Sequence, residues 1–221
     1  MPLLRAIVFD FDGVLADSEP LHLLAYQEVL SGLGVTFTRE EYYAAYLGYD
    51  DAGVFTALAE ANGWELDESK LSTLIAEKGR VFDAIVETTD VLYPGAAACI
   101  EGLAAEFSIG IASGALRPEI EAVLRRAGLG RHFRFIVASG ETPRSKPAPD
   151  PYIRAAELHA LPPAACLAIE DSRWGIVSAK EAGLSCVGIT TTYPPTELAM
   201  ADRIIDSLSE FTPAFVRSLS A

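Results

Sequence analysis

Short apolar runs alternate with helical patterns over most of this chain, and this alternation restricts the fold more than any other feature. From Tyr93 onward, each apolar run has the length of a buried strand, and helical patterns separate most of the runs. This order is typical of a parallel sheet covered by helices. The expected strands are 108–112, 133–138, 166–169, 186–190 and 203–205. With an N-terminal strand over residues 6–9, they predict an α/β fold with a doubly wound (Rossmann-like) parallel sheet.

The segment 17–92 breaks this alternation, because it has helical periodicity and no convincing strand. Apolar residues recur at helical spacing from Leu23 to Leu33, and Gly34 is expected to stop that helix. Further helices are expected over 39–47, from 51 or 52 to 62, and from about 68 to 86. We therefore expect an α/β core domain formed by residues 1–16 and 93–221, with an inserted all-helical cap domain at 17–92. Residues 17–20 and 88–90 are the expected hinges.

The composition is that of an ordinary globular protein of 221 residues, of which 50% are hydrophobic and 22% charged. A formal net charge of −14 argues against nucleic acid or an anionic membrane as a partner. No apolar run approaches the about 20 residues that a membrane helix needs. Cys99, Cys166 and Cys186 have no paired spacing, which indicates a reducing compartment, so we expect a cytoplasmic protein. The oligomeric state cannot be read from the sequence.

Two aspartates, Asp10 and Asp12, follow the N-terminal apolar run and precede Gly13. In an open α/β sheet, the carboxyl ends of the strands form the ligand site. A solvated strand end explains one aspartate there. Two carboxylates so close repel each other unless a cation or a proton is present. Magnesium prefers oxygen ligands, so this pair predicts a Mg²⁺ site.

Polar residues of the kinds used in phosphoryl transfer follow three later strands. Ser113 and Gly114 offer a hydroxyl and free backbone N–H groups for a phosphoryl oxygen. Lys146 lies between prolines that fix the backbone around its ammonium group. Glu170 and Asp171 add two acids that, with the first aspartate, complete an oxygen cage for Mg²⁺. Taken alone, the first of these features is explained by a turn, the second by a solvated lysine and the third by a helix cap. Their combination predicts a site for phosphoryl transfer.

Together these residues suggest a two-step reaction. Asp10 attacks a phosphoryl group and forms an aspartyl-phosphate, while Asp12 protonates the leaving oxygen and later deprotonates the attacking water. Lys146 and the metal offset the repulsion between carboxylate and phosphate, and Ser113 positions the transferred group.

The order of these motifs resembles the haloacid dehalogenase superfamily over essentially the whole chain. The segments that look like its first to fourth motifs are Asp10-Phe-Asp12-Gly13, Ser113, Lys146 and Glu170-Asp171. The likeness is closest to the branch of β-phosphoglucomutase and the phosphoglycolate or sugar-phosphate phosphatases. It implies a phosphoric monoester hydrolase acting on a small phosphorylated metabolite. It also implies a Mg²⁺ ion bound by Asp10, the main-chain carbonyl of Asp12 and Asp171, with Glu170 ligating directly or through water.

The choice between phosphatase and mutase depends on the helical segment. His22 stands where the mutase branch has a histidine near the cap hinge, and Lys78 resembles its cap lysine. These two residues and Gly114 are the candidate substrate-binding residues, although packing explains His22 and Lys78 equally well. Asp51 stands where a mutase is expected to carry an arginine for a second phosphate, and its charge would repel one. We therefore interpret the chain first as a phosphatase and second as a mutase.

A non-catalytic phospho-acceptor of a signalling protein is a third alternative. Such domains also place strand-end carboxylates, Mg²⁺ and a lysine on a doubly wound sheet, so the fold alone does not exclude one. The helical segment and Asp12 favour an enzyme. Outside the motifs, His132 and His159 are expected on the surface or in packing roles, and Trp174 in the core.

Overall fold

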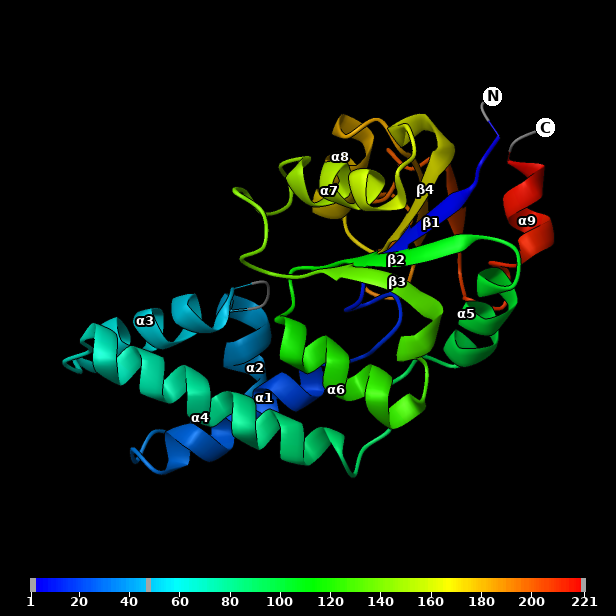
Figure 1. Cartoon of the computed structure of the whole chain (residues 1–221). Helices are drawn as coiled ribbons and strands as arrows, with labels where there is room; N and C mark the ends of the chain where they lie inside the picture. The colour runs from blue at the N-terminus through cyan, green and yellow to red at the C-terminus, as the bar shows by residue number, and fades with distance from the viewer. Residues whose placement is uncertain (1–2, 47–48, 220–221) are drawn as a thin grey trace. The chain divides into compact units, whose positions relative to one another are not determined.

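The computed structural model describes residues 3–46 and 49–219. Backbone contacts divide the chain into two compact units. The sheet unit comprises Met1–Asp17 and Val91–Ala221, and the helical unit comprises Ser18–Asp90. Figure 1 shows the elements of both units, coloured along the chain.

The described part of the sheet unit contains a six-stranded sheet in the order β3-β2-β1-β4-β5-β6, with all neighbouring strands parallel. The strands are β1 (Ala6–Phe9), β2 (Ser108–Ala112), β3 (Phe133–Val137), β4 (Cys166–Glu170), β5 (Ser185–Ile189) and β6 (Arg203–Ile205). This confirms the predicted doubly wound parallel sheet. Strand β5 lies one residue earlier than expected, and β4 extends to Glu170.

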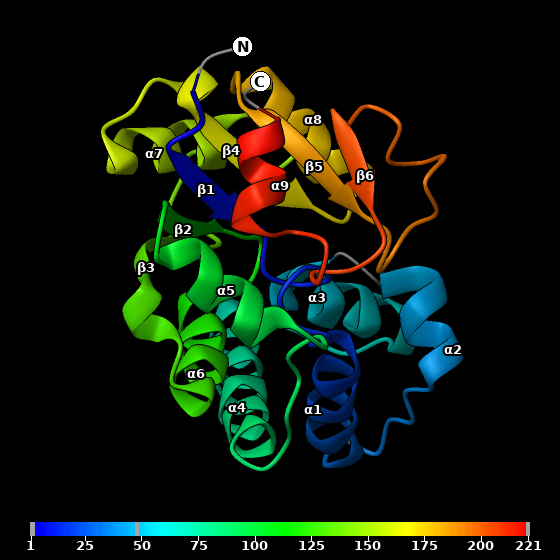
Figure 2. The same cartoon turned by 90° about the vertical axis from the view of Figure 1, so that its right-hand side faces the viewer.

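Helices cover both faces of this sheet. They are α5 (Ala96–Ala104), α6 (Arg117–Ala127), α7 (Asp150–His159), α8 (Arg173–Glu181) and α9 (Pro213–Ser218), with short 3₁₀ turns η2 (Gly130–His132) and η3 (Pro163–Ala165). In Figure 2, α7 and α8 lie on one face, and α5 and α9 lie on the other. Residues alternate between the faces along β1: Ala6 and Val8 belong to the cluster that contains Tyr152 of α7, whereas Phe9 contacts Phe211. Covering both faces explains why the central strands are continuous apolar runs.

The helical unit contains α1 (Glu19–Ser31), α2 (Arg39–Glu41), the π-helical η1 (Tyr42–Tyr46), α3 (Asp51–Asn62) and α4 (Glu68–Val86). No strand occurs among its residues 18–46 and 49–90. Its core is rich in aromatic rings, among them Tyr26, Phe37, Tyr42 and Phe55.

Two helix boundaries differ from the sequence prediction. The first helix ends at Ser31, before Gly34, which adopts a left-handed φ of 74° in the following turn. The helix expected over 39–47 is a short α-helix followed by a π-helix, and the expected end at Leu47 lies outside the described residues. Among residues 3–46 and 49–219, no helix combines the length and apolar character needed to cross a membrane.

Candidate active site

The parallel register of β1, β2 and β4 brings three strand ends to one edge of the sheet. Phe9 of β1 is aligned with Ile111 of β2 and with Ile169 of β4. The next residue of each strand or loop therefore lies at the same edge, where open α/β sheets bind ligands. The backbone N–H of Asp10 donates to the carbonyl of Ile169 at 3.0 Å, which continues the ladder one residue beyond β1.

Lys146 joins two carboxylates at this edge. Its Nζ donates to Oδ1 of Asp10 at 2.7 Å and to Oε1 of Glu170 at 2.6 Å. Burial alone would lower the pKa of Lys146, but the charges of Asp10 and Glu170 raise it above the usual lysine value. The ammonium group is therefore a fixed positive charge beside Asp10.

Asp10, Glu170 and Asp171 form a buried acidic cluster. Each offers a carboxylate oxygen within 4.8 Å of the others. Burial raises the pKa of Asp10 to about 7, the charge of Lys146 opposes this shift, and the charge of Glu170 adds to it. Burial and the charges of Asp10 and Glu170 also raise the pKa of Asp171 well above its usual value. Three crowded carboxylates beside one ammonium group leave excess negative charge, and hard oxygen donors of this kind fit Mg²⁺.

Asp12 and Gly13 lie in the tight turn after β1. The charge of Asp12 contributes to the raised pKa of Asp10, so the two carboxylates interact. Gly13 has a φ of 76°, and a Cβ there would lie 2.0 Å from Oδ2 of Asp171. Only glycine fits this approach of the turn to the acidic cluster. The Thr191 hydroxyl donates to the carbonyl of Gly13 and ties a later loop to this turn.

Ser113 follows β2 and is buried. Its backbone N–H donates to the carbonyl of Val137 at 2.9 Å, and its hydroxyl oxygen accepts from the N–H of Ala115 at 3.0 Å. A Cβ at Gly114 would meet nothing within 4 Å, so the backbone there is open to an approaching group. The hydroxyl proton of Ser113 remains available to a phosphoryl oxygen.

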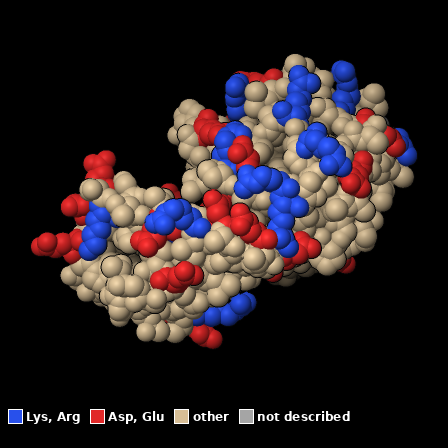
Figure 3. Space-filling view, turned by 60° about the horizontal axis from the view of Figure 1, so that its bottom comes forward, with Lys and Arg blue, Asp and Glu red and all other residues tan. Residues whose placement is uncertain are grey.

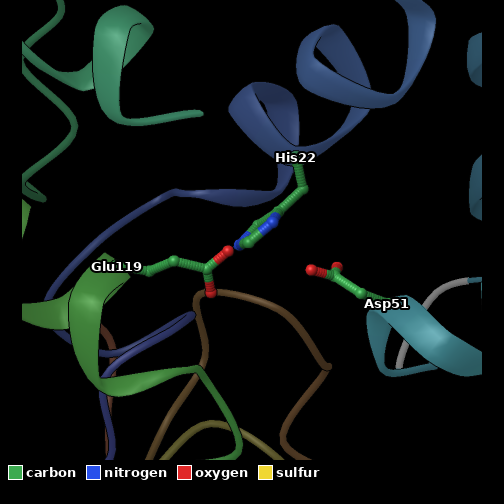
Figure 4. A group of neighbouring side chains, drawn as sticks. All are labelled: His22, Asp51 and Glu119. Carbon is green, nitrogen blue, oxygen red and sulfur yellow. The ribbon is translucent and has the colours of Figure 1, made fainter. Parts of the chain in front are cut away.

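A second polar cluster lies inside the helical unit. Nζ of Lys78, on α4, lies 2.7 Å from Nδ1 of His22 and 2.9 Å from Oδ1 of Asp51. The Tyr26 hydroxyl donates to that same oxygen at 2.5 Å, and the His22 ring stacks on Phe82. Figure 4 shows His22 on α1 and Asp51 at the start of α3; Glu119, also labelled, belongs to the sheet unit.

Lys78 and Asp51 form an ion pair in this second cluster. Lys78 is fully buried, so its ammonium group is paired with the Asp51 carboxylate inside the helical unit. Burial and the charge of Lys78 lower the pKa of His22 to about 3, although Asp51 opposes this. His22 is therefore neutral at ordinary pH. The loop before Asp51 begins at Leu47 and Gly48, which lie outside the described residues.

Comparison with known proteins identifies the family. The model of the haloacid dehalogenase-like hydrolase family matches residues 4–183. The chain belongs to this family. The hydrolase is 33% identical over 214 residues to protein CbbY of Rhodobacter capsulatus, covering 93% of this chain and 94% of the relative. It is 31% identical over 219 residues to phosphoglycolate phosphatase of Pseudomonas syringae pv. syringae, covering 95% and 79% of the two chains.

Solved structures agree with this assignment. The crystal structure of CbbY from Rhodobacter sphaeroides in complex with xylulose-(1,5)bisphosphate has a TM-score of 0.83 and 29% identity, and covers 94% of this hydrolase and 96% of that chain. The β-phosphoglucomutase of Clostridium difficile shares the fold, with a TM-score of 0.82 at 21% identity and coverage of 98% and 96%. The family and the enzyme class expected from the sequence are therefore confirmed.

Two residues of the hydrolase that contact the acidic cluster escaped the sequence analysis. The Tyr152 hydroxyl donates to Oε1 of Glu170 at 2.7 Å. The Thr192 side chain hydrogen-bonds Asp171, which opposes the rise in its pKa. Neither residue belongs to a sequence motif. Tyr152 reads as an ordinary core position of α7, and Thr192 lies in a turn after β5.

The structure also bears on three residues outside the motifs. Trp174 is 49% exposed, so its expected core position was wrong. It lies at the start of α8, where the Arg173 guanidinium stacks 3.9 Å from its ring centre. His159 is buried beside Ser108, in the expected packing role, with its Nδ1 3.0 Å from the hydroxyl. His132 ends η2 in the sheet unit.

Proposed function

We propose that this hydrolase is a Mg²⁺-dependent phosphatase of a small phosphorylated metabolite, of the sugar phosphate or phosphoglycolate type. The observation that carries the proposal is the position of Asp10. Its carboxylate lies at the end of the central strand, held by Lys146 at 2.7 Å within a group of buried acids. A carboxylate in this setting is a nucleophile with a cation already beside it.

The residues present fit a bound Mg²⁺ ion. Burial and the neighbouring carboxylates raise the pKa of both Asp10 and Asp171, and a bound divalent cation would favour their charged forms. We propose that Asp10, Asp171 and the main-chain carbonyl of Asp12 hold the ion, with Glu170 ligating directly or through water. When bound, Mg²⁺ neutralises charge on the phosphoryl oxygens.

The reaction proceeds in two steps on this chain's own residues. A carboxylate oxygen of Asp10 attacks phosphorus, the bond from phosphorus to the leaving oxygen breaks, and Asp12 gives its proton to that oxygen. Asp12 then takes a proton from water as the water oxygen attacks the aspartyl-phosphate. This releases inorganic phosphate and restores Asp10. Lys146, Ser113 and the backbone at Gly114 bind and orient the phosphoryl group during both steps.

The helical unit supports a phosphatase over a mutase. We propose that it acts as a cap, with His22 and Lys78 as its candidate substrate-binding residues. The ammonium group of Lys78 is already paired with Asp51 at 2.9 Å. A second phosphate would therefore meet a neutralised cation and an added carboxylate, which disfavours the bisphosphate intermediate of a mutase. A relative 29% identical to this chain is nevertheless a β-phosphoglucomutase, from Bacillus subtilis, so the mutase remains the second candidate.

The cysteines and the family match bear on two further expectations, the location of the protein and the signalling alternative. The three cysteines are free and buried, which supports a reducing, cytoplasmic location. The match to a hydrolase family makes the phospho-acceptor signalling domain the weakest alternative.

Phosphorus NMR tests the proposal directly. Purified protein with Mg²⁺ is incubated with phosphoglycolate, several sugar monophosphates and a sugar bisphosphate, with Asp10→Asn as the control. We expect inorganic phosphate to appear with wild-type protein, and its rate of release to fall by about a thousandfold or more with Asp10→Asn. Isomerisation of a sugar phosphate without phosphate release would establish the mutase instead. A long-lived phosphoryl adduct without turnover would establish the signalling domain.

A further inference from the structure

The hydroxyl of Tyr152 contacts the acidic cluster from a helix that carries none of the sequence motifs. The ring is fully buried in the apolar cluster between the sheet and the α7 and α8 helices. A phenylalanine would fill the same volume, so packing does not require the hydroxyl. The hydroxyl nevertheless makes a buried hydrogen bond of 2.7 Å to Oε1 of Glu170. A role of the hydroxyl other than packing would explain this hydrogen bond.

The oxygen that accepts from Tyr152 also accepts from Lys146. The Lys146 ammonium lies 2.6 Å from this oxygen and 2.7 Å from Oδ1 of Asp10. One cation therefore stands between two carboxylates that compete for it. The position of the cation depends on how much of the Glu170 charge is satisfied by other donors, because each such donor weakens the attraction of Glu170 for the ammonium.

Tyr152 is well placed to determine how strongly Glu170 attracts the ammonium group of Lys146. The N–H and hydroxyl of Ser172 reach only Oε2 of Glu170, at 3.4 and 3.2 Å, which are long hydrogen bonds. The Tyr152 ring also lies near the ammonium, with Nζ of Lys146 5.0 Å from the ring centre. One side chain thus contacts both members of the Lys146–Glu170 pair.

We propose that Tyr152 is a positioning residue of the phosphoryl-transfer site. Its hydroxyl satisfies part of the charge of Glu170 and thereby keeps the ammonium of Lys146 on Asp10, where the incoming phosphate needs a positive charge. Tyr152 acts through Glu170 and Lys146 rather than on the substrate. This inference rests on the proposed function, because that function gives Lys146 its purpose beside Asp10.

Tyr152→Phe tests the proposal in the full chain, with p-nitrophenyl phosphate and Mg²⁺ as the assay. The variant keeps the ring, so folding is preserved. We expect kcat/KM to fall about tenfold, the usual effect of losing one hydrogen bond to a charged group, with most of the loss in kcat. The matched control is Tyr42→Phe, which removes a hydroxyl that donates to the Glu19 carboxylate at 2.5 Å in the helical unit. We expect its activity to be unchanged.

A double-mutant cycle separates positioning from packing. In a Glu170→Gln background, the carboxylate charge that Tyr152 moderates is gone, so adding Tyr152→Phe should change kcat/KM by less than twofold. A full tenfold effect in both backgrounds would show that Tyr152 does not act through Glu170. Wild-type activity of the single Tyr152→Phe variant would also overturn the proposal.

Crystal structures of wild-type and Tyr152→Phe protein give a readout that does not depend on activity. We expect Nζ of Lys146 in the variant to move toward Glu170 and out of hydrogen-bonding distance of Asp10. An unmoved Lys146 would contradict the inference, whatever the kinetics. If wild-type protein hydrolyses no phosphomonoester, the proposed function fails, and the position of Lys146 still decides whether Tyr152 controls it.

Discussion

Glu170 shows how closely the acidic cluster is packed. Its side chain is fully buried, and Lys146 and Tyr152 both donate to one of its oxygens. Gly175, in the first turn of α8, lies against the same carboxylate: a Cβ there would lie 1.8 Å from Oε1 of Glu170. The start of α8 approaches the end of β4 this closely only because residue 175 has no side chain.

Gly175→Ala should therefore damage the site from outside the sequence motifs. The added methyl group forces Glu170 or the first turn of α8 to move, which disturbs Lys146. We expect kcat/KM to fall at least tenfold, and the free energy of unfolding to fall by about 1–3 kcal/mol, the usual cost of overpacking. Kinetics with p-nitrophenyl phosphate and urea unfolding measure the two effects.

Gly102→Ala is the matched control, because Gly102 also lies within a helix of the sheet unit, α5. A Cβ there would meet nothing within 4 Å. The higher helix propensity of alanine should stabilise this variant by up to about 1 kcal/mol and leave turnover unchanged. If the two variants behave alike, the contact with Gly175 does not hold Glu170 in place.

The strand-end residues could be anticipated from the sequence, whereas their supporting contacts could not. Asp10 and Glu170 each stand at the end of an apolar run, and parallel strands bring such ends together whatever the details of packing. Tyr152 reaches Glu170 because α7 packs across the sheet at one particular height and rotation. An apolar pattern shows that residue 152 is buried, but not which polar group its hydroxyl meets.

At the scale of elements, α3 and α4 were predicted well because their ends carry local signals. Asp67 caps α4 by accepting from the N–H of Lys70, and Gly63 ends α3 in a left-handed conformation. Residues 39–46 also begin with a local signal, the cap formed by Thr38, but a cap does not determine the type of helix that follows. There, the rings of Tyr42 and Tyr46 both pack against Phe37, and the turn widens into a π-helix that periodicity does not distinguish from an α-helix.

The Lys78–Asp51 ion pair links α4 to α3. Removing only one of its two charges should lower the free energy of unfolding. Lys78→Met leaves the Asp51 carboxylate without its cation, in a site where the carboxylate is only 11% exposed and Oδ2 has no hydrogen-bond partner among the described residues. We expect urea unfolding to show a loss of about 3–5 kcal/mol. Adding Asp51→Asn removes the unpaired charge and should restore part of that loss.

Lys180→Met provides the comparison, because it breaks a pair of similar length at the surface. Lys180 and Asp202 lie 2.7 Å apart, and their side chains are 33% and 35% exposed. Solvent screening limits the expected loss to at most about 1 kcal/mol. Equal losses in Lys78→Met and Lys180→Met would show that the pair in the helical unit is no stronger than a surface pair.

At the scale of the whole molecule, acidic residues exceed basic ones by 14. On the face shown in Figure 3, the two kinds of side chain are intermixed rather than gathered into a single basic patch. A long-range field of this sign does not attract an anionic substrate. Attraction must therefore be local. Lys146 is the cation that the structure shows at the acidic cluster, and the carboxylates of Asp10, Glu170 and Asp171 already offset its charge. A divalent cation thus becomes the natural means of drawing phosphate to the site.

Mg²⁺ should therefore stabilise the whole protein, and do so more strongly at pH 8 than at pH 6. Burial raises the pKa of Asp10 to about 7 in the metal-free protein, so at pH 6 the ion must displace a proton that is absent at pH 8. One pH unit below the pKa weakens binding by up to about tenfold, or about 1.4 kcal/mol. For a chain of this length, the rise in Tm on adding Mg²⁺ should be about 3–5 °C larger at pH 8.

In metal-free protein, the pKa of Asp10 also determines how stability changes with pH. Because the pKa of Asp10 is higher in the folded than in the unfolded chain, folding takes up a proton between about pH 4 and 7, and stability declines as pH rises through that range. Thermal unfolding with EDTA measures this decline, and added NaCl of equal ionic strength controls for screening. Asp10→Asn should reduce the pH dependence of the Mg²⁺ effect, and the part that remains is expected from Asp171, whose pKa is also raised. An equal or larger rise in Tm at pH 6 would mean that Asp10 does not surrender a proton to the metal.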